Sequence, residues 1–237
     1  MEVGTTGLRP ARGRNRPIGR SVEVSEPDRP PAPLLPPRAT SDGTLRRLEE
    51  AALTLFGDRG YNGVSIRELA EATGITTSSI YAHVKSKEDI LFRLALIGHA
   101  EHHDQLREAL LTSPPDARLQ VTALVRAHVR MHATYPLLAQ VANNELRALS
   151  PAARDKVLAV RGQSERFVLD VVARGVATEI FEVQEPWLAV AAIGGMGIRV
   201  AEWYSPNSGF TIDQVADNYA DFALGVLRAK PYDLPAL

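Results

Sequence analysis

The stretch from Thr76 to Lys85 places polar side chains on one side of a short helix and aliphatic ones on the other. Ile80 and Val84 are four residues apart, a spacing that puts both on the face that packs against a core. The positions left facing outward are Thr77, Ser78, Tyr81, Ala82 and Lys85. Hydroxyl, phenol and ammonium groups on such a face can hydrogen-bond the base edges in the DNA major groove. We therefore predict base or sugar contacts for this face, chiefly for Thr77, Ser78 and Tyr81, and we include Thr76 and Lys85 among the DNA-binding residues.

Two elements must hold this face in place. Ser65 and Glu68 have the spacing of a capping box, which starts a helix by satisfying two free backbone N–H groups. Gly74 is suited to end that helix, because glycine adopts positive φ without strain. Thr76 then opens the second helix. A helix, a glycine turn and a second helix form a helix-turn-helix, in which Arg67 of the first helix is expected to reach a guanine or a phosphate.

The pattern extends beyond this motif. The run LFGDRGYNGVSIRELAEATGITTSSIYAHVKSKEDIL resembles the DNA-binding domain of the TetR family of transcriptional repressors over about 45 residues at fixed spacing. Val84 departs from the phenylalanine of many relatives, but it fills the same inward position. The resemblance implies that Ser65, His83 and Lys87 hold phosphates. His83 can instead be a packed core histidine, and Tyr81 can instead be a helix-packing residue.

Composition sets broad limits on the rest of the chain. The 237 residues contain no cysteine, which excludes disulfides and cysteine-bound zinc and fits a reducing cytoplasm. No run reaches the ~18–20 apolar residues of a membrane span. The formal net charge is −1, and residues 41–90 hold six Lys or Arg against eight Asp or Glu. DNA affinity is therefore expected to depend on dimerisation and on placed contacts, rather than on a strong positive field.

Four segments are predicted along the chain. Residues 1–40 contain half of the 16 prolines and are expected to be a disordered Pro/Arg-rich arm, which either contacts DNA or is an ordinary leader. Residues 41–86 form the helix-turn-helix domain, beginning with a helix over 44–58 that Gly57 and Gly60 stop. Residues 87–230 form a ligand-binding and dimerisation domain, and residues 231–237 form a tail.

The larger domain is predicted to be helical throughout. A long helix runs from Lys87 toward Pro114, and apolar residues recur at helical spacing in the segments that follow, with no lasting alternation of the kind found in strands. Further helices begin near Pro136, Pro151 and Pro186. The fold class is therefore all-α. By the resemblance, the last two helices pair with the same two helices of a second subunit, giving a homodimer that reads a palindromic, double-stranded DNA operator.

Parts of residues 140–228, including Asn144-Glu145, Ser150-Pro151 and Trp203-Tyr204, resemble a subgroup of TetR regulators that respond to acyl-CoA thioesters of fatty-acid or steroid degradation. The resemblance implies an apolar tunnel and cations for phosphates. The candidate effector-binding residues are His128, Met131, Leu138, Val141, Arg147, Arg166, Ile193, Gly194, Gly197, Arg199 and Trp203. The aliphatic members can equally be ordinary core, and Arg199 a solvated interface residue.

Several histidines also recur at helical spacing. His99, His102 and His103 share one helical face, and His128 and His132 are four residues apart on the next helix. Imidazoles are metal ligands, but no carboxylate is placed to complete a set, so no metal site and no cofactor are assigned. No nucleophile–base pair or phosphate loop indicates an enzyme. A regulator with another effector, such as a drug-like molecule or a metal, and an activator without a ligand remain the alternatives.

Overall fold

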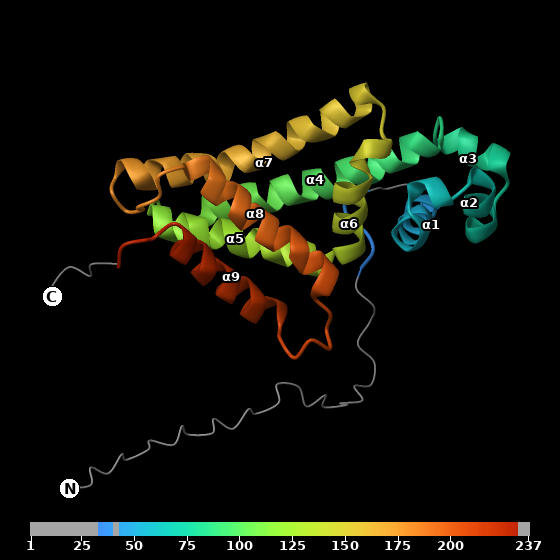
Figure 1. Ribbon diagram of the computed structural model, residues 1–237. Coiled ribbons are helices and arrows are strands. Elements are labelled where there is room, and N and C mark those ends of the chain that lie inside the picture. The colour runs from blue at the N-terminus through green and yellow to red at the C-terminus, as the bar shows by residue number, and fades with distance from the viewer. Residues whose placement is uncertain (1–32, 40–42, 232–237) are drawn as a thin grey trace, which may run out of the picture. The chain divides into compact units, whose positions relative to one another are not determined.

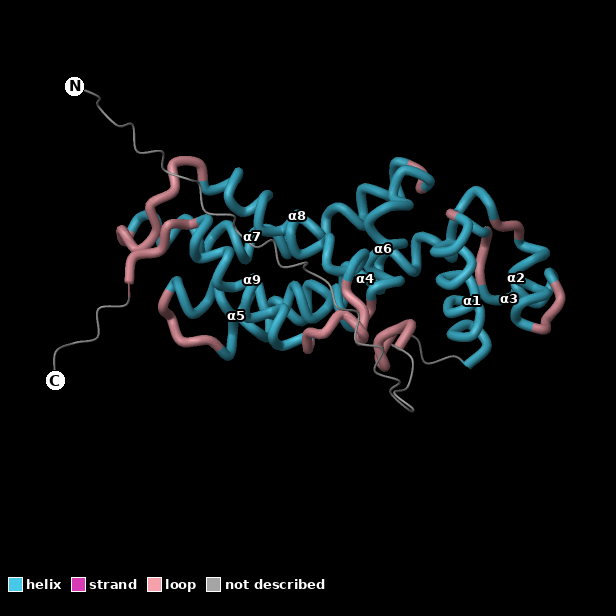
Figure 2. Tube along the Cα trace, turned by 60° about the horizontal axis from the view of Figure 1, so that its bottom comes forward, coloured by secondary structure: helices cyan, strands magenta, loops and turns pink. Residues whose placement is uncertain are grey.

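The computed structural model describes residues 33–39 and 43–231 (Figure 1). Their secondary structure consists of helices joined by short loops, with no strand among the described residues (Figure 2). The helices are α1 (Gly43–Arg59), α2 (Ile66–Thr73), α3 (Thr77–His83), α4 (Lys87–Thr112), α5 (Ala117–Thr134), α6 (Pro136–Asn144), α7 (Pro151–Ala177), α8 (Pro186–Trp203) and α9 (Ile212–Val226), with two 3-10 turns, η1 (Tyr61–Gly63) and η2 (Glu145–Ala148). The all-α prediction is confirmed. None of the described helices is long and apolar enough to cross a membrane.

Helices α1, α2 and α3 form the head of the molecule. The predicted capping box is present, since the Ser65 N–H donates to Glu68 Oε2 over 2.7 Å and the Glu68 N–H donates to Ser65 Oγ over 3.2 Å. Gly74 ends α2 in the left-handed conformation with φ of +67°. Ile80 of α3 is buried in the core between these helices. Local caps and one buried aliphatic residue thus fix the angle at which α3 leaves the turn.

The two glycines expected to stop α1 have different roles. Gly60 follows the last residue of α1 and has a φ of +70°, so it ends the helix as predicted. Gly57 lies inside α1, and the prediction that it stops the helix is wrong. A Cβ atom at position 57 would lie within van der Waals overlap of the Leu137 side chain. Glycine at this position therefore allows α6 to approach α1 closely.

Residues 33–39, which were assigned to the disordered arm, pack against α1. Leu35 is only 1% exposed and belongs to the core of the head. The Arg46 guanidinium donates to the carbonyls of Leu35 and Pro36 over 3.2 and 3.1 Å. The assignment of this short segment to the arm is therefore wrong, because one leucine and one arginine suffice to hold it. The predictions for residues 1–32 and 40 lie outside the described residues.

Helix α4 belongs to both the head and the rest of the chain (Figure 1). Its first half, with Leu91 and Leu94, completes the core of the head together with residues of α6. Its second half contributes Leu106 to a separate core, which is formed mainly by α5, α7, α8 and α9. We call the part built around this second core the body. A boundary drawn at residue 86 marks the start of α4, but the core of the head continues past it.

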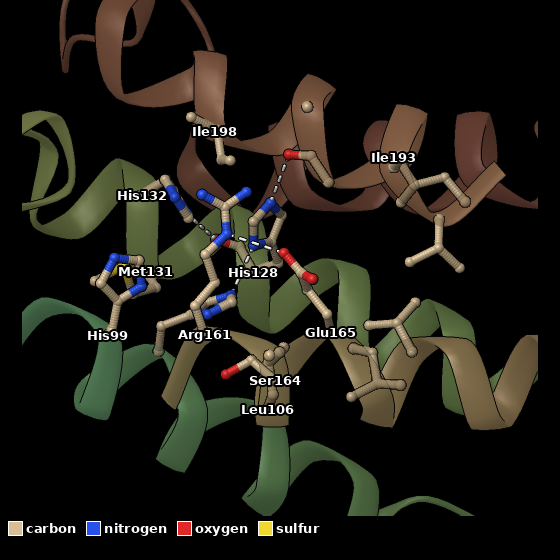
Figure 3. A pocket seen from close by; sticks show the side chains of 18 of the residues that line it. His99, Leu106, His128, Met131, His132, Arg161, Ser164, Glu165, Ile193 and Ile198 are labelled. Atoms are coloured by element: carbon tan, nitrogen blue, oxygen red, sulfur yellow. Dashed lines mark hydrogen bonds and ion pairs between the residues drawn. The ribbon is translucent and has the colours of Figure 1, made fainter. Parts of the chain in front are cut away.

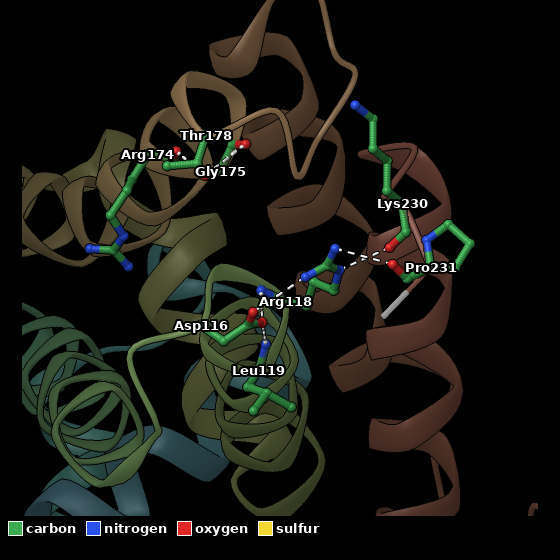
Figure 4. A network of polar contacts seen from close by, with 8 residues as sticks. All are labelled: Asp116, Arg118, Leu119, Arg174, Gly175, Thr178, Lys230 and Pro231. Carbon is green, nitrogen blue, oxygen red and sulfur yellow. Dashed lines mark hydrogen bonds and ion pairs between the residues drawn. The ribbon is translucent and has the colours of Figure 1, made fainter. Parts of the chain in front are cut away.

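The end of the described chain is held against the start of α5 (Figure 4). Asp116 caps α5 by accepting the N–H groups of Arg118 and Leu119. Arg118 in turn donates to the carbonyls of Lys230 and Pro231 over 2.8 and 3.2 Å. The predicted tail therefore begins with an anchored residue at 231, and residues 232–237 lie outside the described part.

Candidate nucleic-acid interface and ligand pocket

The outward face of α3 carries the polar groups that the sequence places there. Thr77, Ser78 and Lys85 are exposed, and the Tyr81 ring is 55% exposed. Thr76 is the N-cap of α3, and its hydroxyl accepts the Ser79 N–H over 3.1 Å. The Thr76 hydroxyl is thus engaged in capping α3. The groups available to hydrogen-bond base edges are those of Thr77, Ser78, Tyr81 and Lys85.

Three further residues were predicted to contact DNA, and they lie on α2 (Arg67), at its N-cap (Ser65) and at the end of α3 (His83). Arg67 lies exposed on α2, and its Nε donates to Glu71 Oε1 over 3.1 Å, a surface pair weak enough to be exchanged for a phosphate. The Ser65 hydroxyl, the Ser65 N–H and the Glu68 N–H are engaged in the capping box, which leaves the N–H groups of Ile66 and Arg67 as the local anion donors at the start of α2. His83 is half-buried at the end of α3. The predicted DNA contacts of these three residues therefore remain a prediction.

Lys87 differs from the other predicted phosphate contacts. Its ammonium donates to the carbonyls of Tyr61 and Val64 over 2.9 and 2.7 Å and lies 4.0 Å from the centre of the Tyr61 ring. The side chain is thus directed toward η1, inside the head. These contacts favour a structural role for Lys87, in which it ties the first turn of α4 to the segment before α2.

A cavity of about 500 Å³ lies among α4, α5, α6, α7 and α8 (Figure 3). Its wall is mainly apolar, which suits an apolar ligand of drug-like size. Five of the candidate effector-binding residues line it. They are His128, Met131, Arg166, Ile193 and Gly194. The two helices predicted to contain most of the site, α5 and α8, therefore do face a cavity.

The three candidates from α6 and η2 do not line the cavity. Leu138 and Val141 are buried in the core of the head, where they pack with residues of α4. Arg147 is exposed in η2. The apolar face of α6 is thus used to join the head to α4, so these residues are not placed to contact a ligand in the cavity.

The last three candidates lie on α8 but do not line the cavity. Gly197 packs against the His128 ring, which occupies the space that a Cβ atom would need. Arg199 is exposed and pairs with Glu202 over 2.7 Å. Trp203 is 45% exposed and lies parallel to the Tyr219 ring of α9. Gly197 thus packs behind the His128 ring of the cavity wall, whereas Arg199 and Trp203, near the end of α8, lie on the outer surface.

Four histidines form one polar part of the cavity wall, and only His128 among them was predicted to bind the effector. His102 Nε2 lies 2.7 Å from His128 Nδ1, and the His128 Nε2 lies 3.1 Å from the Gly194 carbonyl oxygen. His99 and His132 line the cavity beside them. The spacing of these residues on α4 and α5 is a signal in the sequence, but it does not show which faces of the two helices meet. Among the described residues, no group of histidines and carboxylates is arranged to hold a metal ion.

Burial keeps these imidazoles neutral. It lowers the pKa of His99 and His128 to about 4 and that of His132 to about 3, and the neighbouring histidines lower the His132 value further. Burial likewise places the pKa of His102 well below its ordinary value. At neutral pH the cluster therefore offers a ligand hydrogen bonds, and not positive charge. Two arginines of α7, Arg161 and Arg166, are the cations of the cavity wall.

The outer faces of α8 and α9 expose large apolar side chains. Trp203, Phe222 and Val226 are exposed, and the Tyr219 ring lies between those of Trp203 and Phe222. A contiguous apolar surface formed by two adjacent helices is typical of a subunit interface. We call this set of four residues the aromatic patch. It lies on the two helices that were predicted to form the dimer.

Comparisons with known proteins agree on both parts of the chain. Residues 48–94 match the family described as bacterial regulatory proteins of the tetR family, and residues 112–227 match the tetracycline repressor-like C-terminal domain. Over 207 residues the chain is 28% identical to the HTH-type transcriptional repressor KstR2 of Rhodococcus jostii strain RHA1, which covers 84% of this chain and 100% of that protein.

Solved structures have the same fold. A regulatory protein of the tetR family from Rhodococcus RHA1 superimposes with a TM-score of 0.75 at 25% identity and covers 81% of this chain and 100% of its own. AibR, solved in complex with isovaleryl coenzyme A and operator DNA, superimposes with a TM-score of 0.70 at 20% identity, over 79% of this chain and 100% of its own. With both domains matched in order along the sequence, the chain belongs to the TetR family of transcriptional regulators.

Proposed function

We propose that this protein is a transcriptional repressor that binds a palindromic operator as a homodimer and leaves it when a small molecule enters the cavity. One observation carries the proposal: a single helix, α4, forms part of the head and of the cavity wall. A ligand that shifts α4 would change the position of the head, and therefore the spacing of the two α3 helices in a dimer. Such a regulator acts on the bacterial chromosome and would therefore work in the cytoplasm. Its action requires no catalytic step.

The contacts along α4 support this coupling. At its start, Lys87 bonds the head and Glu88 accepts the backbone N–H of Ser150, just before α7, over 2.9 Å. Further along, Arg93 pairs over 2.7 Å with Glu49 of α1, whose side chain is fully buried. The pair resists separation because the Glu49 carboxylate, which is fully buried, would lose its partner charge. The head is therefore bound to move with the first turns of α4.

The cavity fits the acyl-CoA class of effectors. Its apolar wall suits an acyl chain or ring system, and Arg161 and Arg166 can bind the phosphates of the coenzyme. These two arginines replace Arg147 and Arg199 in the proposed cation set. The likeness to KstR2 repressors supports the repressor assignment, and AibR provides an example of this fold with an acyl-CoA and operator DNA bound.

A DNA titration tests both parts of the proposal. The purified protein is titrated against its own upstream DNA by fluorescence anisotropy, alone and with acyl-CoAs of increasing chain size. We expect specific binding that weakens at least tenfold with a fitting acyl-CoA, while coenzyme A without an acyl group has no effect. Absence of specific DNA binding would refute the repressor assignment. Binding that no acyl-CoA weakens would refute only the effector class.

A further inference from the structure

The hydrogen bonds of the histidine cluster determine which ring nitrogen carries the proton. A backbone carbonyl can only accept, so a ring nitrogen bonded to one must donate. His128 Nε2 therefore carries the hydrogen that it donates to the Gly194 carbonyl over 3.1 Å. By the same rule, His99 donates from Nε2 to the Ala142 carbonyl over 3.3 Å, and His132 donates from Nδ1 to the His128 carbonyl over 2.8 Å.

The tautomer of His102 follows from that of His128. A neutral imidazole carries a single N–H, so His128, which donates from Nε2, has a lone pair on Nδ1. His102 Nε2 lies 2.7 Å from that lone pair and must be the donor. Burial, which lowers the pKa of both rings, keeps them neutral. All four N–H groups of the cluster are thus spent within the protein.

What the cluster offers a ligand is therefore a set of acceptors. The nitrogens that keep a lone pair are His99 Nδ1, His102 Nδ1 and His132 Nε2. A ligand carbonyl or ether would find no donor among these rings, whereas a hydroxyl could donate to any of them. A metal ion also seeks lone pairs, but the described residues contain no group arranged to hold one. The geometry thus favours an uncharged donor group on the ligand.

The polar groups differ between the two ends of the cavity. His99 and His132 are only 6% and 3% exposed, so their end is closed off from solvent. Arg166 and Trp187 also line the cavity but are exposed, so they lie at its open end. Arg161, paired with Glu165 over 2.9 Å, lies beside the histidines, and its charge helps to lower the pKa of His99 and His128 (Figure 3). The closed end therefore presents the ring acceptors with the Arg161 guanidinium beside them, and the open end presents the Arg166 guanidinium.

We propose that this cavity selects an effector with an apolar body, a hydroxyl at its buried end and an anionic group at its open end. The inference rests on the proposed function, because it takes the cavity as the effector site, and it specifies the polar group that the effector must carry. The anionic group can be a carboxylate or the phosphates of a coenzyme A thioester. A ligand with a ketone in place of the hydroxyl could accept only from Arg161, would leave the lone pairs of the ring nitrogens without a donor, and would bind more weakly.

The assigned tautomers of the four histidines can be tested without any ligand. Nitrogen-15 NMR of the histidine rings at neutral pH distinguishes Nδ1–H from Nε2–H tautomers and from the charged ring. We expect the Nε2–H form for His99, His102 and His128 and the Nδ1–H form for His132. A charged ring, or any of these four rings in the opposite tautomer, would overturn the proposal, because the cluster would then have a donor to offer.

The ligand class is tested with matched probes. Each probe set shares one skeleton and one carboxylate, and a single carbon far from the carboxylate carries two hydrogens, a hydroxyl or a keto oxygen. One set is built on a cholane carboxylic acid and the other on hexadecanoic acid, so that rigid and linear bodies are both covered. We expect the hydroxylated member of at least one set to bind about tenfold more tightly than both of its counterparts. Equal binding within both sets, or none, would overturn the proposal.

Substitutions that remove the free ring nitrogen but keep the internal hydrogen bond locate the effect, because the amide oxygen that they introduce is an acceptor at a different position. Gln at position 102 retains an N–H near the place of His102 Nε2, and Asn at position 132 retains one near the place of His132 Nδ1. His102→Gln and His132→Asn should each reduce the preference for the hydroxylated probe about tenfold. The control is His103→Gln, because His103 stacks on Phe167 and does not line the cavity. A preference that survives in both variants would contradict the assignment. Operator binding without a probe is measured separately, so a failed repressor assignment is recognised by that result alone.

Discussion

At the scale of single residues, Tyr81 gives the sharpest test of the DNA-binding face. Its ring is 55% exposed on α3, so its removal should leave the core of the head unchanged. We expect Tyr81→Ala to lower the affinity for the operator by about tenfold or more, as the loss of a good base-edge contact does. The thermal midpoint should change little. Fluorescence anisotropy with operator DNA, followed by a thermal melt, measures both quantities.

The matched control for Tyr81 is Leu111→Ala. Leu111 is also a large and exposed side chain, but it lies near the end of α4, far along the chain from the head. Its substitution should affect neither operator affinity nor dimerisation. If Tyr81→Ala retains full operator affinity, Tyr81 does not contact the groove and its role is in helix packing.

The histidine cluster predicts a dependence of stability on pH. His99 and His128 have pKa values of about 4 in the folded chain and His132 one of about 3, all below the ordinary 6.5. As pH falls below about 6.5, these histidines bind protons in the unfolded chain but stay neutral in the folded chain. The free energy of unfolding therefore decreases by up to about 1.4 kcal/mol per pH unit for each histidine. The lowered pKa values of Glu68 and Glu88 act only at lower pH, below their ordinary value.

Thermal melts at pH values between about 7.5 and 5 measure this dependence. The midpoint should fall steadily as pH decreases through this window, and His132→Asn should make the fall less steep, since one titrating group is gone. A midpoint that is flat across the window would show that the rings are charged, or exposed to water, in the folded protein.

At the scale of helices, the sequence predicts boundaries well because the signals are local. The caps at Ser65 and Thr76, and the prolines that begin α6, α7 and α8, depend only on neighbouring residues. Which face of a helix meets which partner depends on residues distant in sequence. Leu138 shows the difference, because its apolar character indicates burial but does not tell the core of the head from the wall of the cavity. For the same reason only His128 of the histidine cluster was predicted to bind the effector, and His99, His102 and His132 were not.

Gly175 meets a packing requirement at the end of α7 that comes from Phe181, shortly after the helix. A Cβ atom there would overlap the ring of Phe181, which is buried and cannot move aside. Gly175→Ala should therefore lower the free energy of unfolding by about 1–3 kcal/mol, despite the better helix propensity of alanine. The value can be measured by urea unfolding followed by circular dichroism.

Gly162 is the matched control on the same helix. A Cβ atom at this position meets nothing within 4 Å, so Gly162→Ala should stabilise the protein by up to about 1 kcal/mol. The combination Gly175→Ala with Phe181→Leu should recover part of the loss. If Gly175→Ala is as stable as the unchanged protein, the end of α7 is less tightly packed than the structure shows.

At the scale of the whole molecule, DNA recognition and ligand response both require a second subunit. The head has no strong positive field, since residues 41–90 hold more acidic than basic side chains. Two heads on one palindromic operator combine their modest affinities, because the second head binds at high effective concentration. A ligand that alters their separation can then cancel this gain without blocking either head. The interface that joins the subunits thus sets both the affinity and its regulation.

The aromatic patch on α8 and α9 is the surface we expect to form that interface. Phe222 is 54% exposed and neighbours the Tyr219 ring, and Trp203 lies on the other side of Tyr219. Phe222→Glu would bury a charge in the middle of an apolar interface, so we expect monomers at micromolar concentration and a loss of operator affinity of at least about a hundredfold. Light scattering after size exclusion gives the mass. Leu111→Glu, at a site on α4 that is 71% exposed, should remain dimeric. A dimeric Phe222→Glu variant with full operator affinity would show that the subunits meet elsewhere.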